Sequence, residues 1–414
     1  MGIYTEYLDK SLDFEQLTRE RKNQLRRIAE LRQRDVLVYA SDSNKASQAP
    51  IQLDNSDLLP IQDQLSNLSG KAIDVLLETG GGRGETAEDI VRLLHLKYES
   101  VAFVVPGMAK SAGTIMVMAG DEILMEPGSS SLGPIDAQIQ WEGKTFSAEA
   151  FLKGLDNIKA EVAETNTLNR AYIPILQRIS PGEIQHAQNA LSFAKVLVET
   201  WLKEHKFRNW DTHRTHSPGD PVTDKQKTER AAGIAQDLCN HSKWLSHGRS
   251  IKLKDLLGIG LEITDYSKTP DLADAIRRYH ILLQMTFDTT NVYKIIETPS
   301  SQIYRFSVNQ QIQVAIPVGG SPSPQGAPAR PGLPQPVQPS GAPSVAGALA
   351  QFVCNQCKKV HTLQADFDEL RPLQQGVERF PSNDILICNQ CHASNNLVAL
   401  RRQIELQTKR KVAR

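Results

Sequence analysis

The sequence predicts an α/β fold with a parallel sheet, followed by a small cysteine-rich domain near the C-terminus. Residues 72–77 and 101–105 are apolar runs typical of buried strands, and each continues through a glycine-containing turn into a helical pattern. Repeated strand–helix units favour a parallel sheet. Two Cys-x-x-Cys pairs close to the C-terminus favour a metal-stabilised module.

Length and charge limit the class of protein. The chain has 414 residues, of which 40% are hydrophobic and 23% charged, enough for two to three domains. Because 47 basic and 47 acidic side chains cancel, the chain as a whole is not predicted to bind nucleic acid or membrane surfaces. No apolar run approaches the roughly 18 residues of a membrane span, and the N-terminus lacks a signal-peptide core. We therefore expect a cytoplasmic protein without a transmembrane segment.

Composition and periodicity divide the chain into six predicted parts. These are an N-terminal amphipathic helix (1–34), an α/β domain (35–266), an α/β extension (267–316), a Pro/Gly-rich linker (317–348), a cysteine-rich domain (349–400) and a basic tail (401–414). The linker is rich in Pro, Gly, Ser, Ala and Gln, so it cannot bury enough apolar surface to fold. Within the α/β domain, residues 140–180 are expected to form a lid, a subunit contact or an extra packing helix.

Ser111 stands between the second predicted strand and a helix of small residues. Such a turn lifts the serine hydroxyl to the edge of the sheet. It also places the amide of Ala112 at a helix N-terminus, where developing negative charge is stabilised. On this segment alone, a nucleophile and a helix N-cap are equally good interpretations of Ser111.

The cluster Gly80-Gly81-Gly82 follows the first predicted strand and favours the nucleophile. No Lys-Ser/Thr pair follows to complete a Walker-type phosphate loop, and the glycine spacing is not GxGxxG. Glycines expose backbone N–H groups that no side chain screens. An oxyanion hole with one donor from this turn and one from Ala112 therefore fits better.

These two turns, in this order, and the following DEILMEPGSSSLGPIDAQ resemble the serine dehydrogenase proteinase family, soluble relatives of signal peptide peptidase A and the Clp protease proteolytic subunit. The likeness covers residues 35–266. It implies a Clp/crotonase-like spiral of βα units, a homo-oligomer and peptide or protein substrates. Aligning the family's Thr-Pro-Gly-Gly turn with residues 79–82 puts Gly80 on the proline and implies Gly82 as oxyanion donor, with Gly81 next.

The resemblance also implies the identity of the base. Asp136 stands where the Clp peptidase has its histidine, so a Ser-Lys dyad, as in signal peptide peptidase A, is the remaining option. A lysine base needs burial to lower its pKa. Lys195 shares a predicted core-facing stripe and is the first choice; Lys159 is the second, whereas Lys153 and Lys110 are expected to point elsewhere.

The four cysteines of the C-terminal domain predict a structural zinc ribbon. Cys354, Cys357, Cys388 and Cys391 form two knuckles that can wrap one Zn²⁺ tetrahedrally. Disulfides fit poorly with a cytoplasmic chain. Cys239, the fifth cysteine, is expected in the core. The ribbon and the basic tail are expected to bind a protein, nucleic acid or the enzyme's own substrate.

The sequence therefore predicts a cytosolic serine endopeptidase that forms an acyl-enzyme, needs no cofactor for catalysis and recruits partners through its zinc ribbon. Two alternatives remain. The first is an inactive Clp-fold scaffold, favoured by the missing turn proline and the uncertain lysine. The second is a crotonase-type acyl-thioester enzyme, in which a serine at this turn would have no purpose.

Overall fold

The computed structural model describes residues 2–141, 144–213, 218–307, 347–357, 359–367, 370–373, 376–398, 400–401, 404–405 and 410–413. Two compact units make up the chain. The first comprises Met1–Phe287 and Val292–Arg305, and the second comprises Asp288–Asn291 and Phe306–Arg414. The predicted linker lies outside the described residues, apart from its last two positions.

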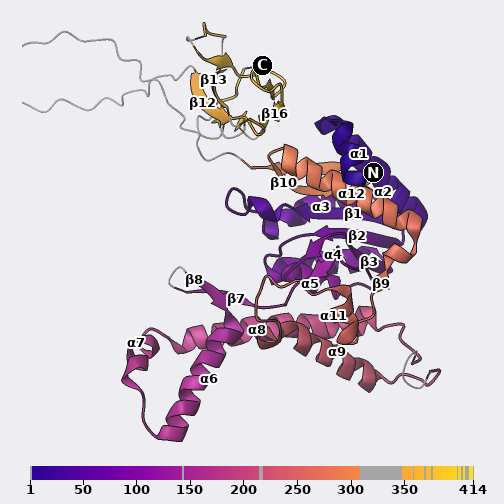
Figure 1. The fold of residues 1–414 in the computed structure, drawn as a ribbon, viewed down its shortest axis with the longest axis vertical. Helices are drawn as coiled ribbons and strands as arrows, with labels where there is room; N and C mark the ends of the chain where they lie inside the picture. Colours follow the sequence, from indigo (N-terminus) through magenta and orange to yellow (C-terminus); the bar gives the residue numbers. More distant parts are fainter. Residues whose placement is uncertain are drawn as a thin grey trace, which may run out of the picture. The chain divides into compact units, whose positions relative to one another are not determined.

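A seven-stranded sheet, ordered β11-β10-β1-β2-β3-β5-β9, forms the centre of the first unit (Figure 1). Five strands run parallel: β1 (Asp35–Ser41), β2 (Ala72–Glu78), β3 (Ser100–Val105), β5 (Glu122–Met125) and β9 (Thr264–Asp265). β10 (Val292–Glu297) is antiparallel to β1, and β11 (Gln302–Phe306) lies at the edge. The predicted α/β fold with a largely parallel sheet is therefore confirmed, and the sequence's extension adds strands to the same sheet.

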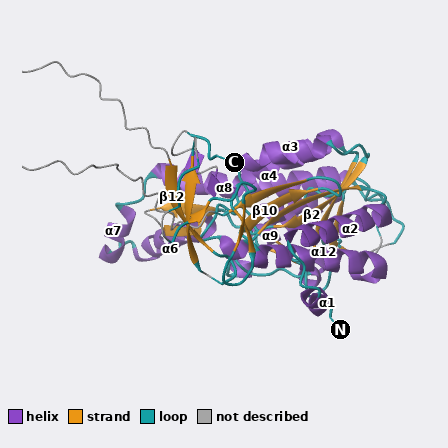
Figure 2. Cartoon of the chain, turned by 90° about the horizontal axis from the view of Figure 1, so that it is seen from above, coloured by secondary structure: helices purple, strands orange, loops and turns teal. Residues whose placement is uncertain are grey.

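Both faces of this sheet are covered by helices. Figure 2 shows α3 (Leu58–Ser66) and α4 (Gly84–Lys97) along one side of the sheet, and α2 (Phe14–Arg32) and α12 (Pro270–Thr289) along the other. Every residue of β3 from Val101 to Val105 is buried. A parallel strand that is covered on both faces needs a nearly continuous run of apolar residues. The strands β2 and β3 could therefore be predicted from the sequence.

The N-terminal residues form two helices, α1 (Ile3–Asp9) and α2, that belong to the first unit. Asp13 caps α2 in a reciprocal capping box with Gln16. The buried Arg21 of α2 donates to Glu297 of β10 over 3.0 Å. This ion pair fixes α2 on the antiparallel side of the sheet.

Short elements connect the strands near the nucleophile turn. They are η1 (Ser43–Lys45), η2 (Asn55–Asp57), β4 (Met108–Ala109), α5 (Ala112–Val117), β6 (Ser131–Leu132) and η5 (Tyr266–Lys268). β4 pairs with β6 in parallel, outside the main sheet. Ser111 lies between β4 and α5.

A helical part follows the β7 (Gln138–Trp141) and β8 (Lys144–Ser147) hairpin. It contains α6 (Ala148–Thr165), η3 (Arg170–Tyr172), α7 (Ile173–Leu176), α8 (Pro181–Trp201), η4 (Leu202–Lys206), α9 (Asp224–Cys239), α10 (His241–Trp244) and α11 (Leu253–Gly258). α8 packs against α6 and α9. In Figure 1, α6 and α7 stand away from the sheet, whereas α11 lies closer to it.

The second unit is a small β domain. β12 (Gly347–Val353) pairs antiparallel with β13 (Val360–Asp366), which pairs in parallel with β14 (Glu378–Arg379). β15 (Ile385–Ile387) and β16 (Ser394–Asn396) form a separate antiparallel pair. Its small core contains Phe352, Leu363 and Phe380.

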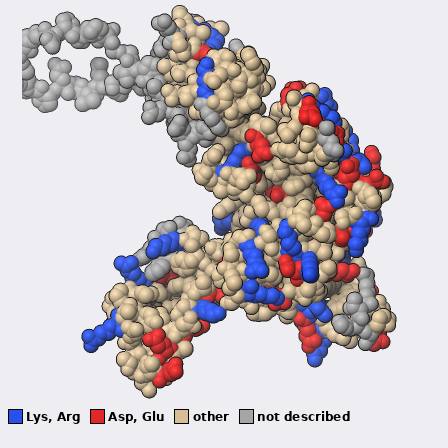
Figure 3. Space-filling view, in the orientation of Figure 1, with Lys and Arg blue, Asp and Glu red and all other residues tan. Residues whose placement is uncertain are grey.

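Basic and acidic side chains are interspersed on the face of the first unit in Figure 3, which agrees with the cancelling charges of the sequence. Among the described helices, none combines the length and apolar character needed to cross a membrane.

Candidate active site

Ser111 has a strained backbone. Its φ of 50° and ψ of −118° are rarely adopted by residues other than glycine, and its side chain makes no capping hydrogen bond to α5. Such a conformation costs on the order of 1–3 kcal/mol and persists only where the surroundings hold it. The geometry therefore does not support a simple N-cap role for this hydroxyl.

The structure brings the two predicted turns together. Thr79 N–H donates to Met108 O, and Lys110 N–H donates to Thr79 O, both over 2.9 Å. Gly81 has a φ of 104°, and a Cβ added there would lie 2.7 Å from Ser111 Cβ and 3.2 Å from Ala112 N. A side chain at position 81 would therefore displace the nucleophile turn.

Two backbone amides at this junction remain available. Gly81 N–H donates to Thr79 Oγ1 over 3.1 Å. Leu53 N–H donates to Gly81 O, and Arg83 N–H donates to Leu53 O, so the intervening Gly82 directs its own amide away from Leu53. No described residue accepts a hydrogen bond from the amide of Gly82 or of Ala112, whereas that of Gly81 is engaged.

The environment of Lys195 differs from the sequence prediction. Its Nζ donates to Gln236 Oε1 of α9 over 2.9 Å and lies 3.7 Å from Glu199 Oε1. The side chain is 41% exposed, while Val198 on the same helix is buried. The predicted core-facing position is wrong, because Lys195 lies at the edge of the α8–α9 contact.

The other lysines also have partners away from Ser111. Lys159 is 71% exposed and pairs with Asp156 over 2.9 Å. Lys153 donates to Ser242 Oγ over 2.9 Å. Within the described residues, none of the three lysines Lys195, Lys159 and Lys153 forms a hydrogen bond with Ser111.

Two partly exposed histidines, His241 and His247, lie beside the buried Asp136. Ser147 and Gln138 donate to its carboxylate, and Nδ1 of His241 and of His247 lie 2.9 Å and 3.7 Å from its Oδ2. Burial alone would raise the pKa of Asp136, but interactions with His247, Ser147 and His241 outweigh it and lower the pKa.

The sequence interpretation missed both histidines. Their only signal was their close spacing in HSKWLSH, and their pairing with Asp136 spans 105 residues in the case of His241. The buried Nδ1 of His247 makes no hydrogen bond with any described residue. Buried polar atoms without partners are rare, so this atom marks these histidines and Asp136 as candidates for function.

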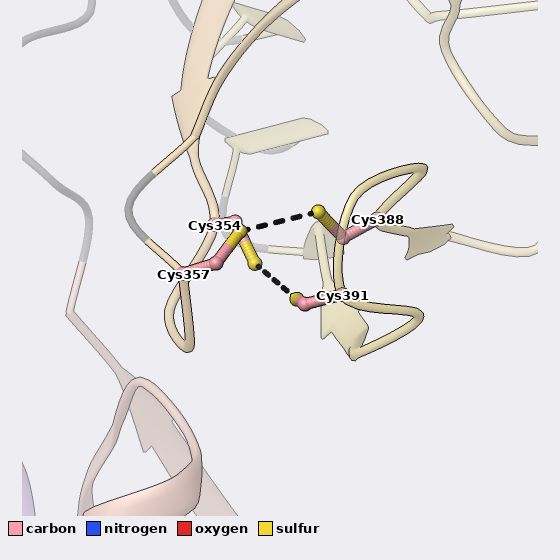
Figure 4. A group of neighbouring side chains, drawn as sticks. All are labelled: Cys354, Cys357, Cys388 and Cys391. Atoms are coloured by element: carbon pink, nitrogen blue, oxygen red, sulfur yellow. Dashed lines mark hydrogen bonds between the residues drawn. The ribbon is translucent and has the colours of Figure 1, made fainter.

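The second unit brings the four predicted cysteines together (Figure 4). All four sulfur atoms lie within 4.8 Å of one another, and the Cys354–Cys391 and Cys357–Cys388 sulfurs are 3.6 Å apart. A metal–sulfur bond of about 2.3 Å gives tetrahedral sulfur–sulfur edges of about 3.8 Å. None of the five cysteines forms a disulfide. The four thiols therefore fit a single tetrahedral metal ion.

Neighbouring polar side chains orient the sulfur atoms of these cysteines. The buried His361 places Nε2 3.3 Å from Cys388 Sγ and Nδ1 2.8 Å from Glu378 Oε1. Asn395 Nδ2 lies 3.7 Å from Cys354 Sγ. Such second partners commonly hold metal ligands in one orientation.

Parts of the chain are similar to known proteins. Two uncharacterized proteins of Methanocaldococcus jannaschii are 30% identical over 119 residues and 28% identical over 89 residues, covering 29% and 22% of this chain. The chain spans only about a third of these relatives, 38% and 30% of their lengths.

Two solved mutant forms of a membrane-bound stomatin-specific protease, one bound to a substrate peptide, match with TM-scores of 0.30 and 0.28 and 16% identity. The matches cover 51% and 61% of this chain, and 74% and 80% of those chains. Residues 6–185 match the family model of the ClpP-like SDH-type serine proteinases. Through this segment, which is less than half of the chain, the protein is similar to the ClpP-like SDH-type serine proteinases.

Proposed function

We propose that this protein is a serine endopeptidase that cleaves peptide bonds through an acyl-enzyme on Ser111. The observation that carries the proposal is the contact between the strained Ser111 turn and the glycine turn, which leaves the amides of Gly82 and Ala112 available. Backbone amides arranged in this way suit a developing oxyanion. The match of residues 6–185 to a family model of serine proteinases supports the same reaction.

In this mechanism a base takes the proton of Ser111 Oγ as the oxygen attacks the peptide carbonyl. The amides of Gly82 and Ala112 donate to the resulting oxyanion. The base then protonates the departing amine, which leaves an ester on Ser111, and water hydrolyses that ester in a second, equivalent step. Removing one oxyanion donor typically lowers kcat by about 10²–10³-fold.

For the base, we retain a Ser-Lys dyad with Lys195 as first choice and Lys159 as second. Both Nζ atoms have other partners in the described arrangement, so the dyad requires α8 or α6 to move when substrate binds. His247 is the alternative, because its buried Nδ1 faces the Asp136 carboxylate at 3.7 Å. Catalytic hydrogen bonds are often long before substrate binds.

We also propose a structural Zn²⁺ on Cys354, Cys357, Cys388 and Cys391, because the sulfur spacing suits four thiolate ligands. The zinc ribbon and basic tail would recruit a protein or nucleic-acid partner, or the substrate. A reducing cytoplasm would keep these cysteines available as ligands.

A homo-oligomer is the proposed assembly. In support of it, α6 and α7 form part of an open, largely apolar groove of about 430 Å³. Its lining includes Leu155, Val162, Leu168, Leu176 and Ile184. Exposed apolar surface of this kind commonly marks a protein contact.

The deciding experiment is labelling of the full-length protein with a fluorophosphonate probe. We expect labelling of the wild type and none of Ser111→Ala, with both proteins folded by circular dichroism. A folded wild type that resists the probe up to about pH 9 would instead support the scaffold alternative.

A further inference from the structure

We propose that Lys110 is a positioning residue for Ser111, and that its ammonium group clamps the nucleophile turn to two neighbouring segments. The inference rests on the proposed peptidase function and adds a residue to the same site. Lys110 directly precedes Ser111, whose strained backbone needs support from its surroundings.

The backbone of Lys110 is held on both sides. Its N–H donates to Thr79 O over 2.9 Å, and its carbonyl accepts from Gly113 N–H over 2.8 Å. A Cβ added to Gly81 would lie 2.7 Å from that same carbonyl oxygen. Small shifts of Lys110 would therefore reach both the glycine turn and the start of α5.

The side chain of Lys110 points away from Ser111 and ends in three hydrogen bonds. Its Nζ donates to Leu132 O over 3.0 Å, and to Arg249 O and Ser250 Oγ over 2.9 Å each. An ammonium carries three N–H donors, so these acceptors match its full capacity. A neutral amine has only two and would release one acceptor.

The two segments that carry these acceptors are hydrogen-bonded to each other. Leu132 and Ile251 exchange backbone hydrogen bonds of 3.0 and 2.9 Å, which ties the two acceptor segments together. Thr114 Oγ1 of α5 accepts a hydrogen bond from Gly133 N–H over 3.0 Å, which connects α5 to the segment that contains Leu132. The aliphatic part of Lys110 packs on Gly133, where a Cβ would lie 2.7 Å from Lys110 Cδ.

The charge of the clamp is sensitive to pH. Burial and, to a smaller extent, the positive charge of Lys252 together lower the pKa of Lys110 to about 8. Lys252 follows the acceptor segment and donates to Gly128 O over 2.7 Å. No described carboxylate pairs with Lys110 to offset these effects. Above about pH 8 the clamp should therefore lose one of its three hydrogen bonds.

The test is the rate of inactivation by a fluorophosphonate, measured as kinact and KI across pH on the full chain. We expect Lys110→Met to lower kinact about 10- to 100-fold with KI nearly unchanged, because a misplaced nucleophile slows reaction without weakening binding. In the wild type, kinact should decline above about pH 8. Lys110→Arg should lack that decline, since a guanidinium stays charged.

Lys252→Gln and Lys254→Gln form the matched pair of controls. Removing the Lys252 charge should move the alkaline decline to higher pH, because that charge lowers the pKa of Lys110. Lys254 is exposed on α11, so its replacement should leave the pH profile unchanged. Thermal unfolding of each variant separates misplacement from loss of fold.

Two results would overturn the inference alone: a folded Lys110→Met with wild-type kinact, or a Lys252→Gln profile identical to that of Lys254→Gln. The second applies even if Lys110→Met does not fold. A wild type that is never labelled would overturn the peptidase function and this inference together.

Discussion

Gly81 and Ser111 are in contact across two turns: a Cβ on Gly81 would lie 2.7 Å from the Cβ of Ser111. The two residues come from different strand–helix connections of one parallel sheet. This approach unites the candidate nucleophile with the candidate oxyanion donors.

Gly81→Ala should abolish labelling of Ser111 by a fluorophosphonate. The added methyl would push the serine turn away, and alanine is strained at a φ of 104°. We expect labelling to fall at least about 100-fold and unfolding free energy by about 1–3 kcal/mol. Gly128→Ala is the control, because position 128 has a φ of 87° but no atom within 4 Å of an added Cβ. It should lose stability and keep labelling; equal loss of labelling in both would contradict the steric explanation.

Lys195→Ala should lower the labelling rate about 10²–10⁴-fold if the proposed dyad operates. Lys159→Ala should behave as the wild type, since Lys159 is exposed and paired with Asp156. The measurement is the second-order labelling rate constant at neutral pH. Retention of labelling in Lys195→Ala together with its loss in His247→Gln would transfer the base to the histidine beside Asp136.

Unfolding free energy should decrease on acidification through the pKa of a stacked histidine pair. The rings of His95 and His205 stack with centroids 3.6 Å apart. Burial and the neighbouring His95 lower the pKa of His205 to about 4. A lowered histidine pKa means that the folded state takes up its proton at a lower pH than the unfolded state does. Stability from this group is therefore complete above about pH 6.5 and lost as pH falls towards about 4.

We expect this loss to be about 1–2 kcal/mol, measured by denaturant unfolding between pH 7 and about 4.5. His205→Phe should flatten the curve. His186→Gln, which changes an exposed histidine on α8, should reproduce the wild-type slope. An unchanged slope in His205→Phe would assign the acid sensitivity to other groups.

One Zn²⁺ should bind per chain, and Cys357→Ser should weaken its binding strongly because three thiolates remain. Chelation should remove the metal and make the ribbon thiols reactive, as measured by thiol titration and metal analysis. Cys239→Ser is the matched control, because burial raises the pKa of Cys239 to about 12 and keeps it unreactive. Full zinc content in Cys357→Ser would argue against the four-cysteine site.

Features that depend on neighbours in sequence could be predicted. Residues 72–77 and 101–105 are apolar in unbroken runs, and the structure shows them in β2 and β3. The knuckles that begin at Cys354 and Cys388 likewise depend on the two-residue spacing of a Cys-x-x-Cys pair, which is present in the sequence itself. In each case the signal is local because backbone hydrogen bonding or ligand geometry sets the spacing.

The exposure of the Lys195 side chain could not be predicted from the sequence. Helical periodicity placed it on a stripe with buried residues, but the side chain lies at the edge of that stripe beside Gln236 of α9. Periodicity defines the relative direction of side chains on one helix, whereas burial depends on the angle at which the next helix crosses it.

By itself, the sequence determined the strand–turn–helix units, the position of Ser111 at one of those turns and the two Cys-x-x-Cys pairs. Only the tertiary structure decided that Gly81 touches Ser111, that Lys110 is clamped by Leu132, Arg249 and Ser250, and that His241 pairs with Asp136. The physical reason is distance along the chain. Local patterns record short-range hydrogen bonding and burial, whereas contacts between residues 22 to 140 positions apart arise only when sheet and helices pack together.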